Sequence, residues 1–313
     1  MKKSVYLRGK IGTCWYNFTE GIAYLLTYKR TPKNLLYGRH LPYGEEKKQY
    51  LNTYCRKDLI AKSKPLFIYV HGGGWISGIT DMRNAYIQNF ANEGYFTASI
   101  SYSYAPKKVF PEPIREICAA IDRIFDMAEE KNIDTSRIVL SGESAGVYYI
   151  FYLAALAADN SLAEKIGVKF EHISDFKPRA MVAHCGCVNL EHLLDKNLPQ
   201  SRFPDIKMMT CSFLGKPMKE AREYLATEEG KLASPSITKG FPPAFFTTGD
   251  KDWLRYEGYD MMKKYDELGI KYEHFEGTKA LGNHAWTIVT KLKQGRRCLE
   301  KTLAFLKTML PGD

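Results

Sequence analysis

The residues Gly142-Glu143-Ser144-Ala145-Gly146 form the pattern G-x-S-x-G, in which a serine can act as a nucleophile. The apolar residues before this pattern predict a short strand and those after it predict a helix, so Ser144 is expected on a sharp turn between them. The flanking glycines would leave room for the neighbouring strand and helix. Because small residues are common, the pattern could also occur by chance. The other residues that acyl transfer requires must therefore be sought elsewhere in the chain.

Acyl transfer through serine also needs hydrogen-bond donors for the oxyanion that forms during the reaction. The sequence His71-Gly72-Gly73-Gly74-Trp75 directly follows an apolar run that predicts a buried strand. The backbone N–H groups of Gly72 and Gly73 could donate to the oxyanion there, together with the N–H of Ala145. A run of glycines can also form a flexible turn or a phosphate-binding loop. A phosphate-binding loop would continue into a Gly-Lys-Ser/Thr pattern, and none follows here.

A general base and an acid that orients it complete the requirements. His284 follows the last predicted strand and is expected to open the terminal helix, which would let its imidazole reach the edge of the sheet. His274 lies within that last strand and is expected to be a packed or exposed sheet residue. Asp250 and Asp252 both follow the next-to-last strand, and both remain candidates for the acid.

Composition excludes several other classes of protein. The chain has 313 residues, 45% of them hydrophobic, and a formal charge of +10, as expected of a globular protein. Basic and acidic residues are interleaved, which indicates a generic basic surface and no nucleic-acid partner. Seven cysteines without a regular framework favour reduced thiols and a cytoplasmic location. His184, Cys185 and Cys187 lack two further ligands at suitable spacing, so neither a metal nor another cofactor is expected.

The N-terminal segment 1–45 is aromatic-rich and its first part is predicted to be helical. We expect it to pack on its own protein, although Lys29, Arg30 and Lys33 would also suit a helix that lies on a membrane surface. No apolar run approaches the length of a membrane span, and the start of the chain lacks the pattern of a signal peptide. Stable membrane insertion is therefore not expected.

Strand and helix signals alternate along most of the chain. Strands are predicted at 49–56, 65–70, 95–101, 138–140, 179–184, 241–248 and 271–275, and helices at 82–93, 114–131, 258–268 and 285–306. This alternation predicts an α/β fold with a mostly parallel sheet and helices on both faces, its first strand at a sheet edge. Between 188 and 236 the pattern gives way to short helices and loops, which indicates an inserted cap. No repeat or linker divides residues 1–313 into separate domains.

The order of HGGGW, GESAG, an aspartate loop and a late histidine resembles the α/β-hydrolase fold, and more closely the hormone-sensitive-lipase-like esterases and acetyl esterases. The segments 101–106 and 110–113 are similar to the family's Y-R-L-A-P and F-P-A-P motifs, and the resemblance covers residues 65–286. The family's D-P-L-R-D-E block maps onto residues 252–257, which favours Asp252 over Asp250. Trp253 replaces the usual proline and Tyr256 the second acid. The resemblance also implies a helical cap built from residues 1–45 and 188–236.

These features together predict a serine carboxylesterase that acts on small-molecule esters with short, acetyl-type acyl groups. Ser144 would attack the ester carbonyl with His284 as base and Asp252 holding the imidazole, and water would then hydrolyse the acyl-enzyme. The predicted substrate pocket consists of aromatic residues, namely Trp75, Tyr104, Tyr148 and Trp253. An amidase, exopeptidase or formamidase with the same triad is the alternative, and a non-catalytic ligand-binding member of the fold is a third. A homodimer is left open.

Overall fold

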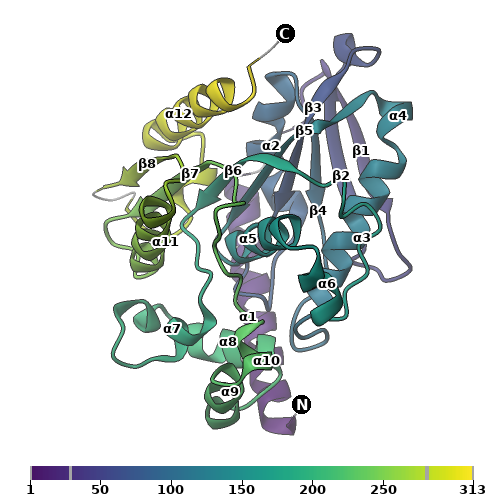
Figure 1. Ribbon diagram of the computed structural model, residues 1–313. Helices are drawn as coiled ribbons and strands as arrows, with labels where there is room; N and C mark the ends of the chain where they lie inside the picture. Colours follow the sequence, from purple (N-terminus) through teal and green to yellow (C-terminus); the bar gives the residue numbers. More distant parts are fainter. Residues whose placement is uncertain (1, 28–29, 279–281, 312–313) are drawn as a thin grey trace.

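A single sheet of eight strands forms the centre of the computed structural model, which describes residues 2–27, 30–278 and 282–311 (Figure 1). The spatial order is β1-β2-β4-β3-β5-β6-β7-β8, in which β2 is antiparallel to its two neighbours β1 and β4 and all the remaining pairs are parallel. The strands are β1 (Leu35–Pro42), β2 (Tyr50–Arg56), β3 (Lys64–Val70), β4 (Phe96–Ile100), β5 (Ile133–Glu143), β6 (Pro178–His184), β7 (Ala244–Gly249) and β8 (Tyr272–Gly277).

Helices cover both faces of this sheet, as the alternation of strand and helix predicts. Because side chains alternate along a strand, Leu66 and Ile68 of β3 lie on one face and Phe67 and Tyr69 on the other. The first face packs against α3 (Glu112–Asp126), α5 (Ala145–Ala158) and α11 (Arg255–Leu268). The second face packs against α2 (Asn84–Asn92) and α12 (Lys293–Met309). The chain therefore has the α/β-hydrolase architecture expected from its sequence.

A group of helices gathers at one end of the sheet (Figure 1). It consists of α1 (Lys3–Thr27), α7 (Leu190–Leu194), η3 (Pro199–Arg202), α8 (Ile206–Leu214), α9 (Met218–Leu225) and α10 (Glu228–Lys231). All but α1 come from the segment in which the strand and helix pattern breaks down. The remaining short elements are η1 (Lys57–Leu59), η2 (Thr80–Arg83), α4 (Ala128–Lys131), α6 (Ser161–Lys165) and η5 (Trp286–Ile288).

Three sequence predictions need correction. Residues 35–42 form β1 at the sheet edge, so only the α1 part of segment 1–45 lies with the cap helices. In consequence β2 is not an edge strand, since it lies between β1 and β4. Most side chains of β1 are exposed or half-buried, so the strand lacks the apolar pattern that identifies buried strands. His284 does not open the terminal helix, because η5 follows it and α12 begins only at Lys293.

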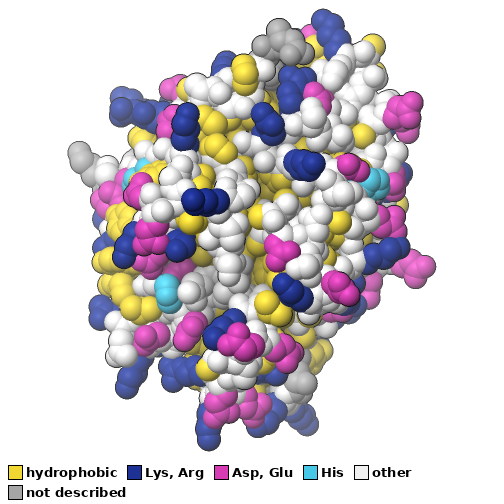
Figure 2. Space-filling model, viewed as in Figure 1, with side chains coloured by type: hydrophobic (Ala, Val, Ile, Leu, Met, Phe, Trp, Pro, Cys, Tyr) yellow, Lys and Arg dark blue, Asp and Glu magenta, His cyan; other side chains and the backbone are white. Residues whose placement is uncertain are grey.

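The surface carries charges of both signs. Figure 2 shows acidic and basic side chains mixed over the face in view, without a large region of one sign. This mixture agrees with the generic basic surface predicted from the sequence. Over the described residues, no helix is both long enough and apolar enough to cross a bilayer.

Candidate active site

Ser144 lies on the sharp turn that joins β5 to α5. Its backbone has φ 55° and ψ −123°, a conformation that residues other than glycine rarely adopt. The backbone N–H of Ser144 donates to the carbonyl oxygen of His184 in β6 at 2.9 Å, which fixes the turn on the sheet. A Cβ on Gly146 would lie 2.1 Å from the Val70 oxygen, and one on Gly142 would lie 2.7 Å from Gly146. The two glycines of the motif are therefore required by close backbone contacts.

Asp252 and His284 form a hydrogen-bonded pair beside this turn. Oδ2 of Asp252 lies 2.7 Å from Nδ1 of His284, and Oδ1 accepts a hydrogen bond from the backbone N–H of Leu254 at 2.9 Å. The carboxylate is buried, whereas the imidazole is 24% exposed. Nε2 of His284 has no hydrogen-bond partner among the residues that the structure describes. The imidazole is thus oriented through Nδ1, and its other nitrogen is available to a nearby group.

Ser144 and His284 line the same cavity, which has a volume of about 180 Å³. Gly73, Gly74 and Ala145 contribute to its wall. Among the described residues no hydrogen bond joins Ser144 to His284. Such a bond is often long or poorly aligned before substrate binds. The position of both side chains on one cavity is therefore the observation that links Ser144 to His284.

The glycine loop after β3 forms a further part of the cavity wall. Gly73, Gly74 and Trp75 all have positive φ, at 120°, 59° and 62°, so the chain turns tightly here. A Cβ on Gly72 would lie 2.5 Å from the Glu143 oxygen and 3.0 Å from Cβ of Ser144, which shows how closely the loop approaches the elbow. Within the described part of the chain, the amides of Gly73 and Gly74 donate to no backbone carbonyl. Ala145 is the first residue of α5, so its N–H also lacks a partner within the helix.

A buried histidine helps to fix this loop. His71 is fully buried, its ring stacks on Tyr102 with centroids 4.4 Å apart, and its Nδ1 lies 2.7 Å from the Gly72 oxygen. Burial lowers the pKa of His71 to about 3, so the imidazole is neutral at ordinary pH. The residue therefore supports the loop and carries no charge into the site.

A buried ion pair lies next to the elbow, at the residue before Ser144. Nε of Arg83 lies 2.5 Å from Oε1 of Glu143, and the hydroxyl of Tyr69 donates to Oε2 of Glu143. Both Arg83 and Glu143 line the cavity. Sequence reasoning did not identify this pair, because Glu143 occupies a variable position of the G-x-S-x-G pattern.

Of the four aromatic residues predicted to form the substrate pocket, one lines the cavity. Trp75 lines the cavity, but Tyr104, Tyr148 and Trp253 do not. Tyr148 is fully buried behind Trp75, with its hydroxyl donating to the Ala233 oxygen at 2.6 Å. Tyr104 lies beside Asn17, with its hydroxyl 3.2 Å from the amide nitrogen, and the ring of Trp253 packs against Arg202 outside the cavity.

The side chains that complete the cavity come mainly from the cap, and sequence reasoning missed them. They are Tyr16 of α1, Phe203 after η3, and Ile206 and Met209 of α8. The Phe203 ring lies edge-on to the imidazole of His284, with centroids 4.7 Å apart. Only the position of these residues in the folded cap brings them to Ser144, so no local sequence pattern could identify them.

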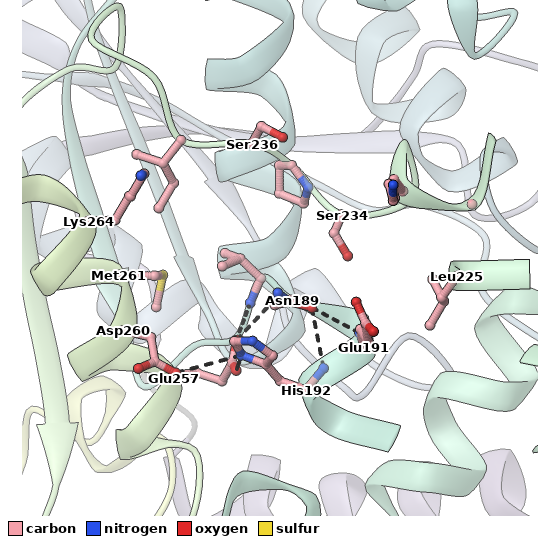
Figure 3. A pocket seen from close by; sticks show the side chains of 15 residues that line it. Asn189, Glu191, His192, Leu225, Ser234, Ser236, Glu257, Asp260, Met261 and Lys264 are labelled. Atoms are coloured by element: carbon pink, nitrogen blue, oxygen red, sulfur yellow. Dashed lines mark hydrogen bonds and ion pairs between the residues drawn. The ribbon is translucent and has the colours of Figure 1, made fainter. Parts of the chain in front are cut away.

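Glu257 of α11 connects the cap to the sheet domain. Figure 3 shows its carboxylate between the start of the cap and α11. Oε2 accepts the backbone N–H groups of Val188 and Asn189 at 3.2 and 3.1 Å. Oε1 lies 2.8 Å from Nδ1 of His192 and accepts a hydrogen bond from Nε2 of Gln200 at 3.0 Å. Since Gln200 belongs to η3, this network also fixes the segment that leads to Phe203.

The same region contains a group of possible metal ligands, His192, Glu257 and Asp260. Each oxygen of Glu257 already has two hydrogen-bond partners, which occupy its lone pairs. The bond to Glu257 raises the pKa of His192, and burial raises the pKa of Asp260. These contacts are those of a hydrogen-bonded network rather than of a site built for a cation.

The histidine and cysteines considered for a metal site from sequence lie deep in the protein. His184 has the hydroxyls of Tyr86 and Thr247 as partners, at 2.6 Å from Nε2 and 3.1 Å from Nδ1. Burial lowers its pKa to about 3 and raises the pKa of the thiols of Cys185 and Cys187. Both ring nitrogens of His184 are thus already engaged.

The BD-FAE family model matches residues 51–256, about two thirds of the chain, and these residues contain the glycine loop, the elbow and Asp252. The chain belongs to the BD-FAE family. Family membership agrees with the resemblance to α/β-hydrolase esterases inferred from the motifs. His284 lies beyond the matched region, so its place in the site rests on the geometry described above.

Among curated relatives, Esterase LipC of Mycobacterium tuberculosis is 27% identical over 224 residues, which cover 70% of this chain and 52% of that protein. The chain thus spans about half the length of LipC. An esterase of Gibberella moniliformis is 25% identical over 269 residues, which cover 84% of this chain and 80% of the relative.

Among solved structures, esterase B of Lactobacillus rhamnosis has a similar fold, with a TM-score of 0.81 and 17% identity over 98% of this chain and 95% of that one. A structure of the same esterase inhibited by a tributyrin phosphonate has a TM-score of 0.79, with 17% identity over 99% and 96% of the two chains. These likenesses agree with the α/β-hydrolase fold of the family.

Proposed function

We propose that the protein is a serine carboxylesterase. The observation that supports this most directly is the 2.7 Å contact between Asp252 Oδ2 and His284 Nδ1, which leaves Nε2 without a partner beside the cavity that Ser144 lines. In this mechanism Nε2 takes the proton of Ser144 as its Oγ attacks the ester carbonyl. The N–H groups of Gly73, Gly74 and Ala145, which all line the cavity, stabilise the oxyanion, whereas Gly72, the donor expected from the sequence beside Gly73, does not line it. The alcohol leaves with the proton from His284, and water then hydrolyses the acyl-enzyme.

The proposed substrates are small esters with short acyl chains. A cavity of about 180 Å³, walled by Trp75, Phe203 and Met209, is smaller than most ligand sites and favours a short acyl group. The esterase names of LipC and of the Gibberella relative support ester hydrolysis, and the phosphonate-inhibited esterase B supports a serine nucleophile on this fold. Seven free cysteines, six of them buried, support the expected cytoplasmic location.

A serine-directed fluorophosphonate probe tests the nucleophile. We expect the purified protein to be labelled and Ser144→Ala not to be labelled, with circular dichroism showing that both are folded. Equal labelling of the two proteins would assign the nucleophile elsewhere. Rates on 4-nitrophenyl acetate and on acyl anilides then compare ester with amide hydrolysis. Faster turnover of the anilides would show that the protein is an amidase and would overturn the proposed esterase function.

A further inference from the structure

Over residues 3–18, helix α1 is packed on the protein along one face only. On that face Val5 is buried, and added side chains at Gly9 and Gly12 would meet Ser212 and Met208 of α8. The opposite face is apolar and exposed. Its residues are Leu7, Ile11, Trp15 and Phe18, which are 57%, 63%, 61% and 63% exposed.

These four side chains form one continuous stripe, the α1 stripe. They recur at intervals of four, four and three residues, which places them on one side of α1 over about 16 Å of its length. The rings of Trp15 and Phe18 lie side by side, with centroids 6.5 Å apart. Scattered single apolar residues on a surface are ordinary, but a helical stripe that includes tryptophan and phenylalanine marks an interaction surface.

Basic residues flank the α1 stripe on both sides. Helical geometry places Arg8 on one flank and Lys3 and Lys10 on the other, and all three are exposed. Residues 3–18 contain no acidic residue. Among the described residues none of these three cations takes part in an ion pair, whereas Lys2 next to them pairs with Glu220 of α9. The flanks therefore offer unneutralised positive charge beside apolar surface.

We propose that the α1 stripe binds the surface of an anionic lipid bilayer, with its apolar side chains among the acyl chains and its basic flanks at the headgroups. Apolar residues that include tryptophan, bordered by lysine and arginine, are typical of helices that lie in the plane of a membrane interface. Charge distinguishes this partner from a second copy of the chain. Two copies joined through the stripe would bring Lys3, Arg8 and Lys10 of both into one interface without an acid from either helix segment to neutralise them.

Binding of this kind would bring the lipid surface close to the cavity. Tyr16 lines the cavity from the packed face of α1, and its hydroxyl donates to Asp205 at 2.9 Å. The α1 stripe occupies the other face of the same helix, so the cavity wall and the bilayer would be separated by about one helix diameter, roughly 10 Å. The inference concerns binding and does not depend on the proposed hydrolysis.

Co-sedimentation of the full chain with vesicles tests the proposal. We expect binding to vesicles of phosphatidylcholine with about one third phosphatidylglycerol, weaker binding to phosphatidylcholine alone, and release by high salt, because the Coulombic part is screened. The double variants Ile11→Ser/Trp15→Ser and Arg8→Glu/Lys10→Glu should each bind at least about tenfold less. The control variant Ile60→Ser removes an exposed apolar side chain from the loop between η1 and β3, far from α1 in sequence. It should bind anionic vesicles as tightly as the parent does.

Failure of the parent protein to bind anionic vesicles would overturn the proposal, as would undiminished binding by both double variants. Circular dichroism melting curves establish that the variants remain folded. Analytical ultracentrifugation provides the test of the rival occupant. A dimer that Ile11→Ser/Trp15→Ser converts to a monomer would assign the stripe to self-association instead.

Discussion

Oδ2 of Asp252 lies 2.7 Å from Nδ1 of His284, although 31 residues separate the two along the chain. Asp252 follows β7 and His284 follows β8, and the two strands are parallel neighbours. Residues that follow neighbouring parallel strands emerge at the same edge of a sheet, so the pairing is a consequence of topology. Asp250 also follows β7, but its backbone turns back toward β8, where its N–H donates to the Gly277 oxygen at 2.9 Å.

The two aspartates should therefore respond differently to the same change. Asp252→Asn removes the carboxylate that orients His284 and stabilises its protonated form, and we expect kcat to fall about 1000- to 10,000-fold. Asp250→Asn is the matched control and should lower kcat by less than about tenfold. Steady-state kinetics on 4-nitrophenyl acetate measures both. A larger loss in Asp250→Asn would transfer the role of the acid to that residue.

The sequence could predict the elbow, the glycine loop and the late histidine because their chemistry restricts the local sequence. Ser144 needs small residues at fixed positions around it, and a Cβ at Gly146 would collide with the backbone of β3. Requirements of this kind are visible within a few residues. The acid could not be predicted in this way, because Asp250 and Asp252 both follow the same strand at suitable spacing. Only the family resemblance favours Asp252.

The sequence could not predict the cavity wall or the sheet edge. Tyr16 and Met209 meet at Ser144 only because α1 packs on α8, a contact between segments nearly 200 residues apart. Trp253 is predicted for the pocket as one of several aromatic residues, but the chain directs its ring outward to Arg202. β1 was missed because an exposed edge strand lacks the apolar alternation of a buried one.

Met209 should limit the length of the acyl chain. Its side chain lines the cavity and contacts Gly74, where an added Cβ would lie 2.3 Å from Sδ. Met209→Ala removes three heavy atoms and should raise the kcat/KM ratio of 4-nitrophenyl octanoate to acetate by about 10- to 100-fold. Met208→Ala is the control, because Met208 contacts Gly12 of α1 and does not line the cavity. An unchanged ratio in Met209→Ala would place the acyl chain elsewhere.

Glu257 should contribute to both stability and catalysis. Glu257→Gln places an NH2 group against two N–H donors of the network, so we expect a loss of about 3 kcal/mol in the free energy of unfolding. Because Gln200 then holds η3 less firmly, Phe203 should pack less regularly against His284, and kcat should fall about tenfold with little change in KM.

Glu191→Gln provides the control for this variant. Glu191 of α7 and Glu257 line one pocket, separate from the cavity at Ser144 (Figure 3), but the side chain of Glu191 is exposed. Urea unfolding and steady-state kinetics on the two variants measure the effects. Equal behaviour of Glu257→Gln and Glu191→Gln would show that the network does not hold the cap.

Buried neutral histidines should make the protein sensitive to acid. Burial lowers the pKa of His184 to about 3, whereas the side chain of the unfolded chain ionises near pH 6.5. Above pH 6.5 the side chain of His184 is neutral in both the folded and the unfolded state, so its burial does not lower the free energy of unfolding. As the pH falls from 6.5 toward 3, the unfolded state binds a proton that the folded state excludes, so the free energy of unfolding decreases. For this one residue the decrease between pH 7 and pH 5 is on the order of 2 kcal/mol.

His184→Gln tests this expectation. Glutamine does not ionise, so the variant is expected to be less stable than the parent at pH 7, because it disturbs the contacts with Tyr86 and Thr247. The gap between the two proteins should narrow by about 2 kcal/mol at pH 5, because only the parent loses stability through this residue. Urea unfolding at the two pH values measures the gap. A gap that stays constant would mean that His184 does not exclude a proton in the folded state.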